Sequence, residues 1–189
     1  MDDAATILSD LAQQICVCPL CRLSQSRTIA VPGEGPPDAP LMFIGEGPGA
    51  QEDATGLPFV GAAGKLLDQL LQSAGLRRSE IFITSLVKCR PPGNREPLPD
   101  EIAACRPYLD AQIATIRPGV IGLLGRRATQ TMFGSQVSMS QEHGVAREQG
   151  GILFVPLYHP AAVLHQRRLL PVLVDDMRRV SEILKSRTT

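Results

Sequence analysis

The sequence predicts an α/β fold built on a short parallel sheet of four strands. Four brief apolar runs have the length and closing residues of buried strands, and they cover residues 41–45, 81–87, 120–124 and 152–157. Between them, apolar residues recur three or four positions apart, as at Leu66, Leu67, Leu70 and Leu71. This spacing is typical of helices that bury one face. Strands that alternate with helices favour a parallel sheet covered by helices.

The remaining chain is assigned to helices and loops by the same criteria. Helices are expected over residues 4–15, 61–74, 126–133 and 172–184. Another begins at Pro99 or Asp100 and carries apolar residues to Ile116, with a bend expected at Pro107. Residues 30–40 and 90–98 are rich in Pro and Gly and predict loops, whereas the polar residues 134–150 predict a loop or a hairpin.

Length and composition indicate one domain over residues 1–189 with a sizeable core. Lys plus Arg and Asp plus Glu both number 19, so the net charge neither favours nor excludes nucleic acid as a partner. No leader pattern and no apolar run of membrane-spanning length are visible. We therefore expect a cytoplasmic protein with no membrane partner, and nothing in the sequence demands more than a monomer.

Four of the five cysteines form a ligand pattern, because Cys18 and Cys21 are two residues apart and Cys89 and Cys105 follow later. In a reducing cytosol, a metal or cluster is a better explanation of such cysteines than disulfides. Four thiolates can hold either zinc or an iron–sulfur cluster, and the spacing alone leaves that choice open. Cys16 stands outside the pattern and is expected to be a small buried residue near the site.

The chemically interesting residues lie on loops that leave the carboxyl ends of the predicted strands, where α/β folds bind their ligands. Gly45-Glu46-Gly47-Pro48-Gly49 follows the first strand, and it is either a plain turn or a close-approach site for a ligand. Phe59 is either a core residue or an aromatic platform for a planar ligand. His159 follows the fourth strand and has either a structural or a catalytic role.

Basic residues gather in two parts of the sequence. Arg77, Arg78, Lys88, Arg90 and Arg95 form one group, and the other consists of Arg167, Arg168, Arg178 and Arg179. Such groups can bind a phosphate backbone even in a protein without net charge, although a solvated surface explains them equally well.

Taken together, the motifs resemble one family. The chain carries Cys-x-x-Cys, Gly-Glu-Gly-Pro-Gly with Glu52-Asp53, Pro-Phe-Val-Gly, Lys-Cys-Arg-Pro-Pro-Gly-Asn-Arg, Cys105 and His-Pro-Ala, in that order. It closely resembles the family 4 uracil-DNA glycosylases, the iron–sulfur members of the uracil-DNA glycosylase superfamily, over residues 18–164.

The resemblance implies a three-layer αβα fold around the parallel sheet and removal of uracil, or of other deaminated bases, from DNA. It implies a 4Fe–4S cluster on Cys18, Cys21, Cys89 and Cys105. Glu46 would orient or deprotonate the attacking water, and His159 would stabilise the departing base. The residues expected to bind the flipped base are Gly45, Gly47, Phe59 and Ser85.

The same resemblance indicates which residues meet the DNA. Residues 161–165 are expected to form a loop that enters the duplex, with Val163 or Leu164 filling the vacated space, although both side chains could instead pack in the core. The basic residues expected at the phosphates are Arg90, Arg95, Arg167 and Arg168.

Ser85 departs from the family pattern, because members usually carry Asn at that position, and its amide reads the uracil edge. A serine hydroxyl is shorter and cannot make a two-point contact. Looser discrimination or lower activity is therefore expected. The alternative function is an iron–sulfur protein that binds damaged DNA without cutting it.

Overall fold

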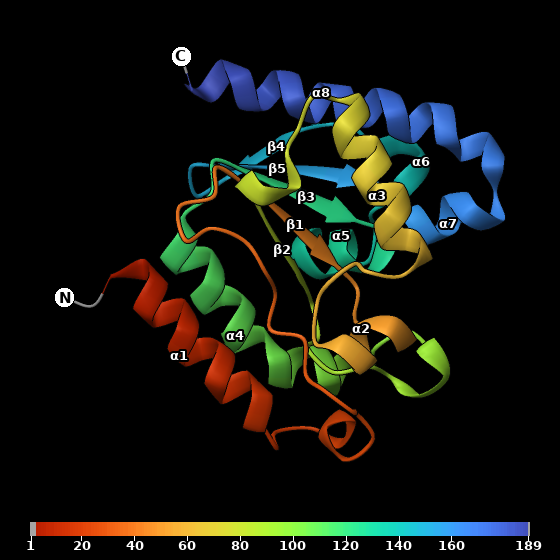
Figure 1. The fold of residues 1–189 in the computed structure, drawn as a ribbon. Helices are drawn as coiled ribbons and strands as arrows, with labels where there is room; N and C mark the ends of the chain where they lie inside the picture. Colours follow the sequence, from red (N-terminus) through yellow and green to blue (C-terminus); the bar gives the residue numbers. More distant parts are fainter. Residues whose placement is uncertain (1–2, 189) are drawn as a thin grey trace.

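The computed structural model describes residues 3–188, whose strands and helices alternate along most of the chain (Figure 1). The five strands are β1 (Leu41–Gly45), β2 (Ile81–Ser85), β3 (Val120–Leu124), β4 (Arg147–Gln149) and β5 (Ile152–Leu157). The α-helices are α1 (Ala4–Val17), α2 (Ala50–Thr55), α3 (Ala62–Ser73), α4 (Pro99–Ile116), α5 (Arg126–Phe133), α6 (Met139–Glu142), α7 (Pro160–His165) and α8 (Leu170–Thr188). None of these described helices is long and apolar enough to cross a membrane.

The strands form one sheet in the order β2-β1-β3-β5-β4, in which the first four are parallel. The chain runs outward from β1 to β2 and then returns to the other side of β1 with β3. This reversal opens a crevice at the carboxyl end of β1, where ligands bind in open α/β sheets. Glu46 is the first residue beyond that end.

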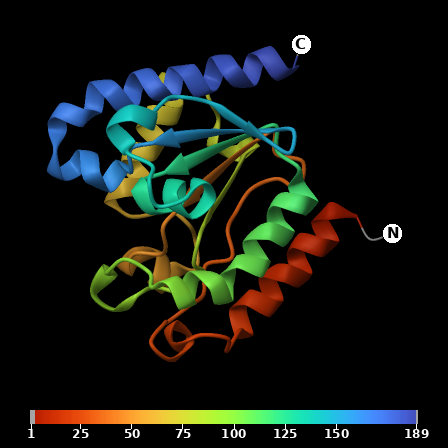
Figure 2. The same ribbon diagram turned by 180° about the vertical axis from the view of Figure 1, so that it is seen from behind.

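Helices cover both faces of the sheet, which gives the expected three-layer αβα architecture. Leu41 and Phe43 of β1 pack in a core cluster with residues of α3 and α8, while Met42 and Ile44 pack with residues of α1, α4 and α5. Alternate residues of one strand therefore bury opposite faces of the sheet. Figures 1 and 2 show α1 lying along α4 on one side, with α3 and α8 on the other.

The structure differs from the sequence prediction in several places, among them helix α6 within residues 134–150. The fifth strand, β4, is antiparallel to β5 across a Gly150-Gly151 turn in which both residues have positive φ, so the hairpin alternative for residues 134–150 is confirmed there. Helix α2 follows the first Gly-rich turn, where no helix was expected. Residues 161–165 belong to helix α7 rather than to a loop.

Candidate functional site

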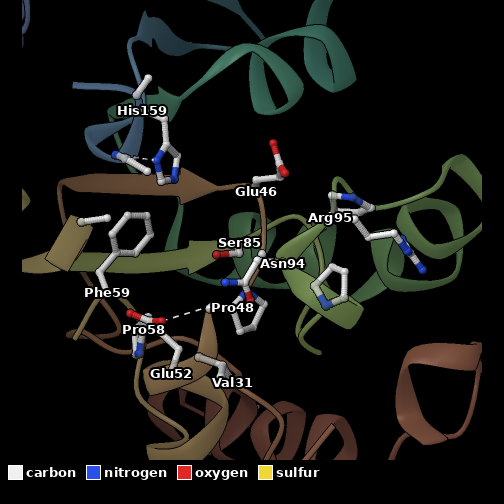
Figure 3. Close-up of a pocket in the computed structure, with 17 residues that line it drawn as sticks. Val31, Glu46, Pro48, Glu52, Pro58, Phe59, Ser85, Asn94, Arg95 and His159 are labelled. Carbon is white, nitrogen blue, oxygen red and sulfur yellow. Dashed lines mark hydrogen bonds between the residues drawn. The ribbon is translucent and has the colours of Figure 1, made fainter. Parts of the chain in front are cut away.

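A cavity of about 380 Å³ lies at the carboxyl ends of the parallel strands. Residues that follow β1, β2 and β5 line it, which brings Glu46, Gly47, Phe59, Ser85 and His159 together. Figure 3 shows the side chains of Glu46, Phe59, Ser85 and His159 around one space, with Arg95 on the side away from Phe59. The volume lies within the range of small-molecule sites, so a single flipped base is a suitable occupant.

His159 is held as a neutral hydrogen-bond donor. Its Nδ1 accepts the backbone N–H of Ala161 at 3.1 Å, at the start of α7. Burial lowers the pKa of His159 to about 4, so the ring is uncharged at neutral pH. With Nδ1 used as an acceptor, the single ring proton belongs on Nε2. The imidazole can therefore donate to an oxygen that gains negative charge in the cavity.

Glu46 is a carboxylate with a raised pKa. Burial is the main cause, and the negative charge of Glu96 adds to it, whereas Arg127 and Arg126 act in the opposite direction. A carboxylate that binds protons more tightly than usual is also a better base towards water. This environment suits a group that must hold or deprotonate a nucleophilic water.

Phe59 adopts a left-handed backbone conformation with φ of 50°, which is rare for an aromatic residue. Arg78 fixes this segment, because its guanidinium donates to the carbonyl oxygens of Pro58 and Phe59 at 2.6 and 3.2 Å. The Phe59 ring lies beside His159, with 5.7 Å between the ring centroids. The ring therefore stands as a wall of the cavity on which a planar base can stack.

Gly45 does not line the cavity, and its role differs from the direct base contact expected from the sequence. A Cβ at this position would lie 2.7 Å from Cζ of Phe59 and 3.2 Å from Oγ of Ser85. The missing side chain instead lets Phe59 and the largely buried Ser85 approach the end of β1.

Glu52, at the start of α2, ties two cavity loops together. Its carboxylate accepts the backbone N–H groups of Gly49, Val60 and Gly61 at 3.1, 2.9 and 2.8 Å. The Gly-rich turn and the segment that carries Phe59 are thus held by one side chain. Sequence reasoning assigned no such role to Glu52, because its partners lie up to nine residues away and are backbone groups.

Cys18, Cys21, Cys89 and Cys105 line one small cavity between the end of α1, the segment after β2 and helix α4. Two donors reach their sulfurs: the Lys88 N–H donates to Cys105 Sγ at 3.3 Å, and Arg27 Nη1 donates to Cys89 Sγ at 3.0 Å. Four converging thiols with N–H donors on their sulfurs fit an iron–sulfur cluster. Zinc can also be held by four cysteine thiolates, so the lining of this cavity leaves the identity of the bound group open. Cys16 is exposed, contrary to the expectation that it is buried.

Lys88 is a further residue whose position the sequence did not reveal. The side chain is 1% exposed, and its Nζ donates to Gln112 Oε1 at 2.7 Å, to the Ser85 carbonyl oxygen at 2.9 Å and to Thr84 Oγ1. It lies between Ser85 in the large cavity and the cysteine cavity, which it lines. Lys88 is therefore an internal brace and not part of a basic surface.

The arginines of the first basic group are also largely engaged within the protein. Arg95 Nη2 pairs at 2.7 Å with Glu101, whose side chain has no exposed surface, and Arg90 donates to Asn94. Arg77 pairs with Glu80, and Arg78 pairs with Asp68. Arg167 and Arg168, by contrast, are exposed in a 3₁₀ turn (Arg167–Leu169) after α7.

Val163 does not reach the surface, which agrees with the core alternative that the sequence left open for it. It is 3% exposed and belongs to the core cluster with α3 and α8, because α7 turns that face inward. Leu164, the next residue, is 45% exposed. Of this pair, only Leu164 is available for a partner.

Comparison with known proteins gives consistent matches over nearly the whole chain. The sequence profile of the Uracil DNA glycosylase superfamily matches residues 32–181. The Type-4 uracil-DNA glycosylase of Saccharolobus solfataricus is 46% identical over 188 residues, which cover 94% of this chain and 86% of that protein. The proteins of the same name from Sulfurisphaera tokodaii and Archaeoglobus fulgidus are 45% and 42% identical, and they cover 93% of this chain and 84% and 92% of their own lengths. These matches agree with the neutral histidine, the carboxylate and the aromatic wall of the cavity. The chain therefore belongs to the uracil DNA glycosylase superfamily, among its type-4 members.

Proposed function

We propose that this protein excises uracil from DNA by hydrolysing the bond between the base and the sugar, leaving an abasic site. The observation that carries the proposal is the meeting of Glu46, Phe59 and His159 at one cavity of suitable size. The relatives that are named Type-4 uracil-DNA glycosylases support the same reaction.

Each side chain has a role in this reaction. The base is flipped out of the helix, because an enzyme cannot reach its sugar bond within the stack. Phe59 stacks on the base, and Ser85 together with the Gly47 backbone contacts its polar edge. As the bond breaks, electrons move onto the uracil ring, and the Nε2–H of His159 donates to the oxygen that becomes negative. Glu46 faces the cation-like sugar and directs water to its C1′ atom, taking the proton that the water loses.

Cys18, Cys21, Cys89 and Cys105 would hold a 4Fe–4S cluster that has a structural role and takes no part in base removal. The cluster would cross-link the N-terminal segment to the chain that follows β2. That chain includes the Lys88–Arg95 loop at the cavity wall. Exposed Arg167, Arg168 and Leu164 complete the proposed DNA-facing rim, with the protein acting as a monomer.

The test is release of uracil from an oligonucleotide that contains a single uracil, followed by cleavage of the abasic site in alkali. Wild-type protein is expected to release uracil, whereas Glu46→Gln and His159→Ala each lower the single-turnover rate by at least about 100-fold. Tight binding without release would instead support the alternative, a non-catalytic binder of damaged DNA. Visible absorption and iron analysis of the purified protein distinguish a cluster from zinc.

A further inference from the structure

Two arginines follow the end of β3, a parallel strand that contributes no residue to the cavity wall. Strand β3 ends at Leu124, and Gly125 turns the chain into α5 with φ of 97°. A Cβ on Gly125 would lie 3.0 Å from Cβ of His159, so this turn rests directly against the catalytic histidine. Arg126 and Arg127 follow immediately, at the same edge of the sheet as the active site.

One carboxylate is shared between these two guanidinium groups. Arg126 Nη2 lies 2.7 Å from Oε1 of Glu96, and Arg127 Nη2 lies 2.7 Å from Oε2. The three side chains therefore carry one unit of positive charge in excess. Although burial opposes it, the hydrogen bonds and charges of Arg126 and Arg127 lower the pKa of Glu96, which keeps the carboxylate ionised.

Another anion can replace Glu96 in its ion pairs with Arg126 and Arg127, whereas the ion pair between Arg95 and Glu101 is fixed. The side chains of Arg126, Arg127 and Glu96 are 61%, 30% and 45% exposed, so the shared carboxylate is in contact with water, where ion pairs contribute little to stability. Glu101, the partner of Arg95, is fully buried and also accepts the Leu98 N–H at 2.8 Å, so it is fixed in place. A second anion can therefore compete for Arg126 and Arg127 but not readily for Arg95.

The competing anion is identified by the position of Glu46. Glu96 stands between Arg95 and Pro97, which line the cavity together with Glu46, and it holds both Arg126 and Arg127 at this rim. The charges of Glu96, Arg127 and Arg126 also act on the Glu46 carboxylate. If Glu46 faces C1′ of the flipped nucleotide, the phosphates attached to the same deoxyribose lie near Glu46 as well. Guanidinium groups bind phosphate oxygens in paired hydrogen bonds, which makes this arginine pair a fitting receptor.

We propose that Arg126 and Arg127 form a backbone-phosphate site beside Glu46, and that Glu96 occupies this site in the free protein and is displaced when DNA binds. The inference rests on the proposed function for its ligand, because it takes the flipped nucleotide of DNA as the source of the phosphate. It adds to that function a point of DNA binding which neither the motifs nor the exposed basic residues indicated.

Equilibrium binding to a uracil-free oligonucleotide, measured by fluorescence anisotropy over a range of KCl concentrations, tests the site without requiring excision. Arg126→Gln/Arg127→Gln is expected to bind more weakly, and the slope of log affinity against log salt is expected to fall by about one, because the variant no longer neutralises the phosphate at this site. Arg126→Lys/Arg127→Lys keeps both charges and is expected to keep most of the slope. Arg106→Gln is the matched control, because it removes an exposed, ion-paired arginine from α4.

The Glu96→Gln variant shows whether Glu96 competes with phosphate for the two arginines or only holds them in position. If Glu96 competes with phosphate, its removal gives tighter binding and a steeper salt dependence, with an unchanged circular dichroism spectrum. Weaker or unaltered binding by Glu96→Gln would overturn the displacement, and a double glutamine variant that binds like Arg106→Gln would overturn the site. A wild-type protein that releases no uracil, yet shows the expected arginine dependence, would refute the proposed function and leave the phosphate site standing.

Discussion

The two candidate catalytic residues receive opposite pKa shifts from related environments. Burial lowers the pKa of His159 to about 4, and burial raises the pKa of Glu46. Both shifts follow from one cause, since a poorly hydrated site disfavours the charged form of either group. The consequence is a histidine that is neutral and a carboxylate that is unusually basic, which is the combination that a donor and a general base need.

The pH dependence of excision should report this combination. We expect the single-turnover rate to be level near neutral pH and to fall on the acid side with a midpoint above the ordinary glutamate value of about 4.3, as Glu46 becomes protonated. A second loss is expected near pH 4, where His159 gains a proton on Nδ1 and releases the Ala161 N–H. Glu46→Gln should remove the first step and keep the second. A midpoint below that of ordinary glutamate would contradict the role given to Glu46, provided that circular dichroism shows a folded protein at each pH.

Ser85 should limit how well the enzyme distinguishes bases. The residue is largely buried and lines the cavity, so its hydroxyl is the one polar side-chain group that it can offer to a base bound there. Ser85→Asn restores a two-point amide contact, and the preference for uracil over hypoxanthine should rise by about tenfold, equivalent to one or two hydrogen bonds. Ser85→Ala, which removes the hydroxyl, serves as the comparison. Identical uracil-to-hypoxanthine ratios of kcat/KM in wild-type and Asn proteins would rule out a selective role.

Helix α3 fixes the position of Phe59 through a missing side chain. A Cβ on Gly64 would lie 1.9 Å from the Phe59 carbonyl oxygen, so the first turn of α3 packs directly on the backbone of the aromatic residue. Together with Arg78, this packing holds the left-handed conformation of Phe59. The platform is thus set by a helix, and not by the loop motif that contains it.

Gly64→Ala should therefore displace Phe59. We expect a loss of about 1–3 kcal/mol in the free energy of unfolding, as for other overpacked sites, and a fall in excision rate larger than this loss explains. Gly119→Ala is the control, because its added methyl would meet only ordinary contacts at 3.7 Å. Urea unfolding and single-turnover kinetics of both variants make the comparison. Full activity in a stable Gly64→Ala protein would show that Phe59 does not depend on this packing.

Elements with a strong local pattern were predicted well from the sequence, and elements defined by distant partners were not. Strands β1 and β3 have the predicted bounds because their apolar runs end at Gly. Helix α7 was missed, although Pro160 at its first position and His159 at its N-cap are recognisable start signals. Lys88 and Glu96 carry no local signal at all, because their roles depend on Gln112 and on Arg126 and Arg127, which are 24 to 31 residues away.

The cysteine cavity connects the outer layer of the molecule to the edge that holds the active site. Helix α1 lies against α4, which carries Cys105, and the chain that leaves α1 carries Cys18 and Cys21 (Figure 1). Cys89 directly precedes the loop that forms one wall of the active-site cavity. A group bound to all four would therefore fix this wall relative to α1 and α4, at a distance from the reacting atoms.

Substitution of one ligand tests this link, and Cys16 provides an internal control because it lies two residues from Cys18 but is exposed and outside the cavity. Cys18→Ser should lose most of its iron and its visible absorption. Its free energy of unfolding should fall by several kcal/mol, on the order of what structural metal sites contribute. Limited proteolysis should then cut first between α1 and β1 and within residues 90–98, since both lose their anchor. Cys16→Ser should match wild type in iron content, unfolding and excision rate. Full iron content and wild-type stability in Cys18→Ser would exclude Cys18 as a ligand, and equal iron loss in both variants would place Cys16 in the site.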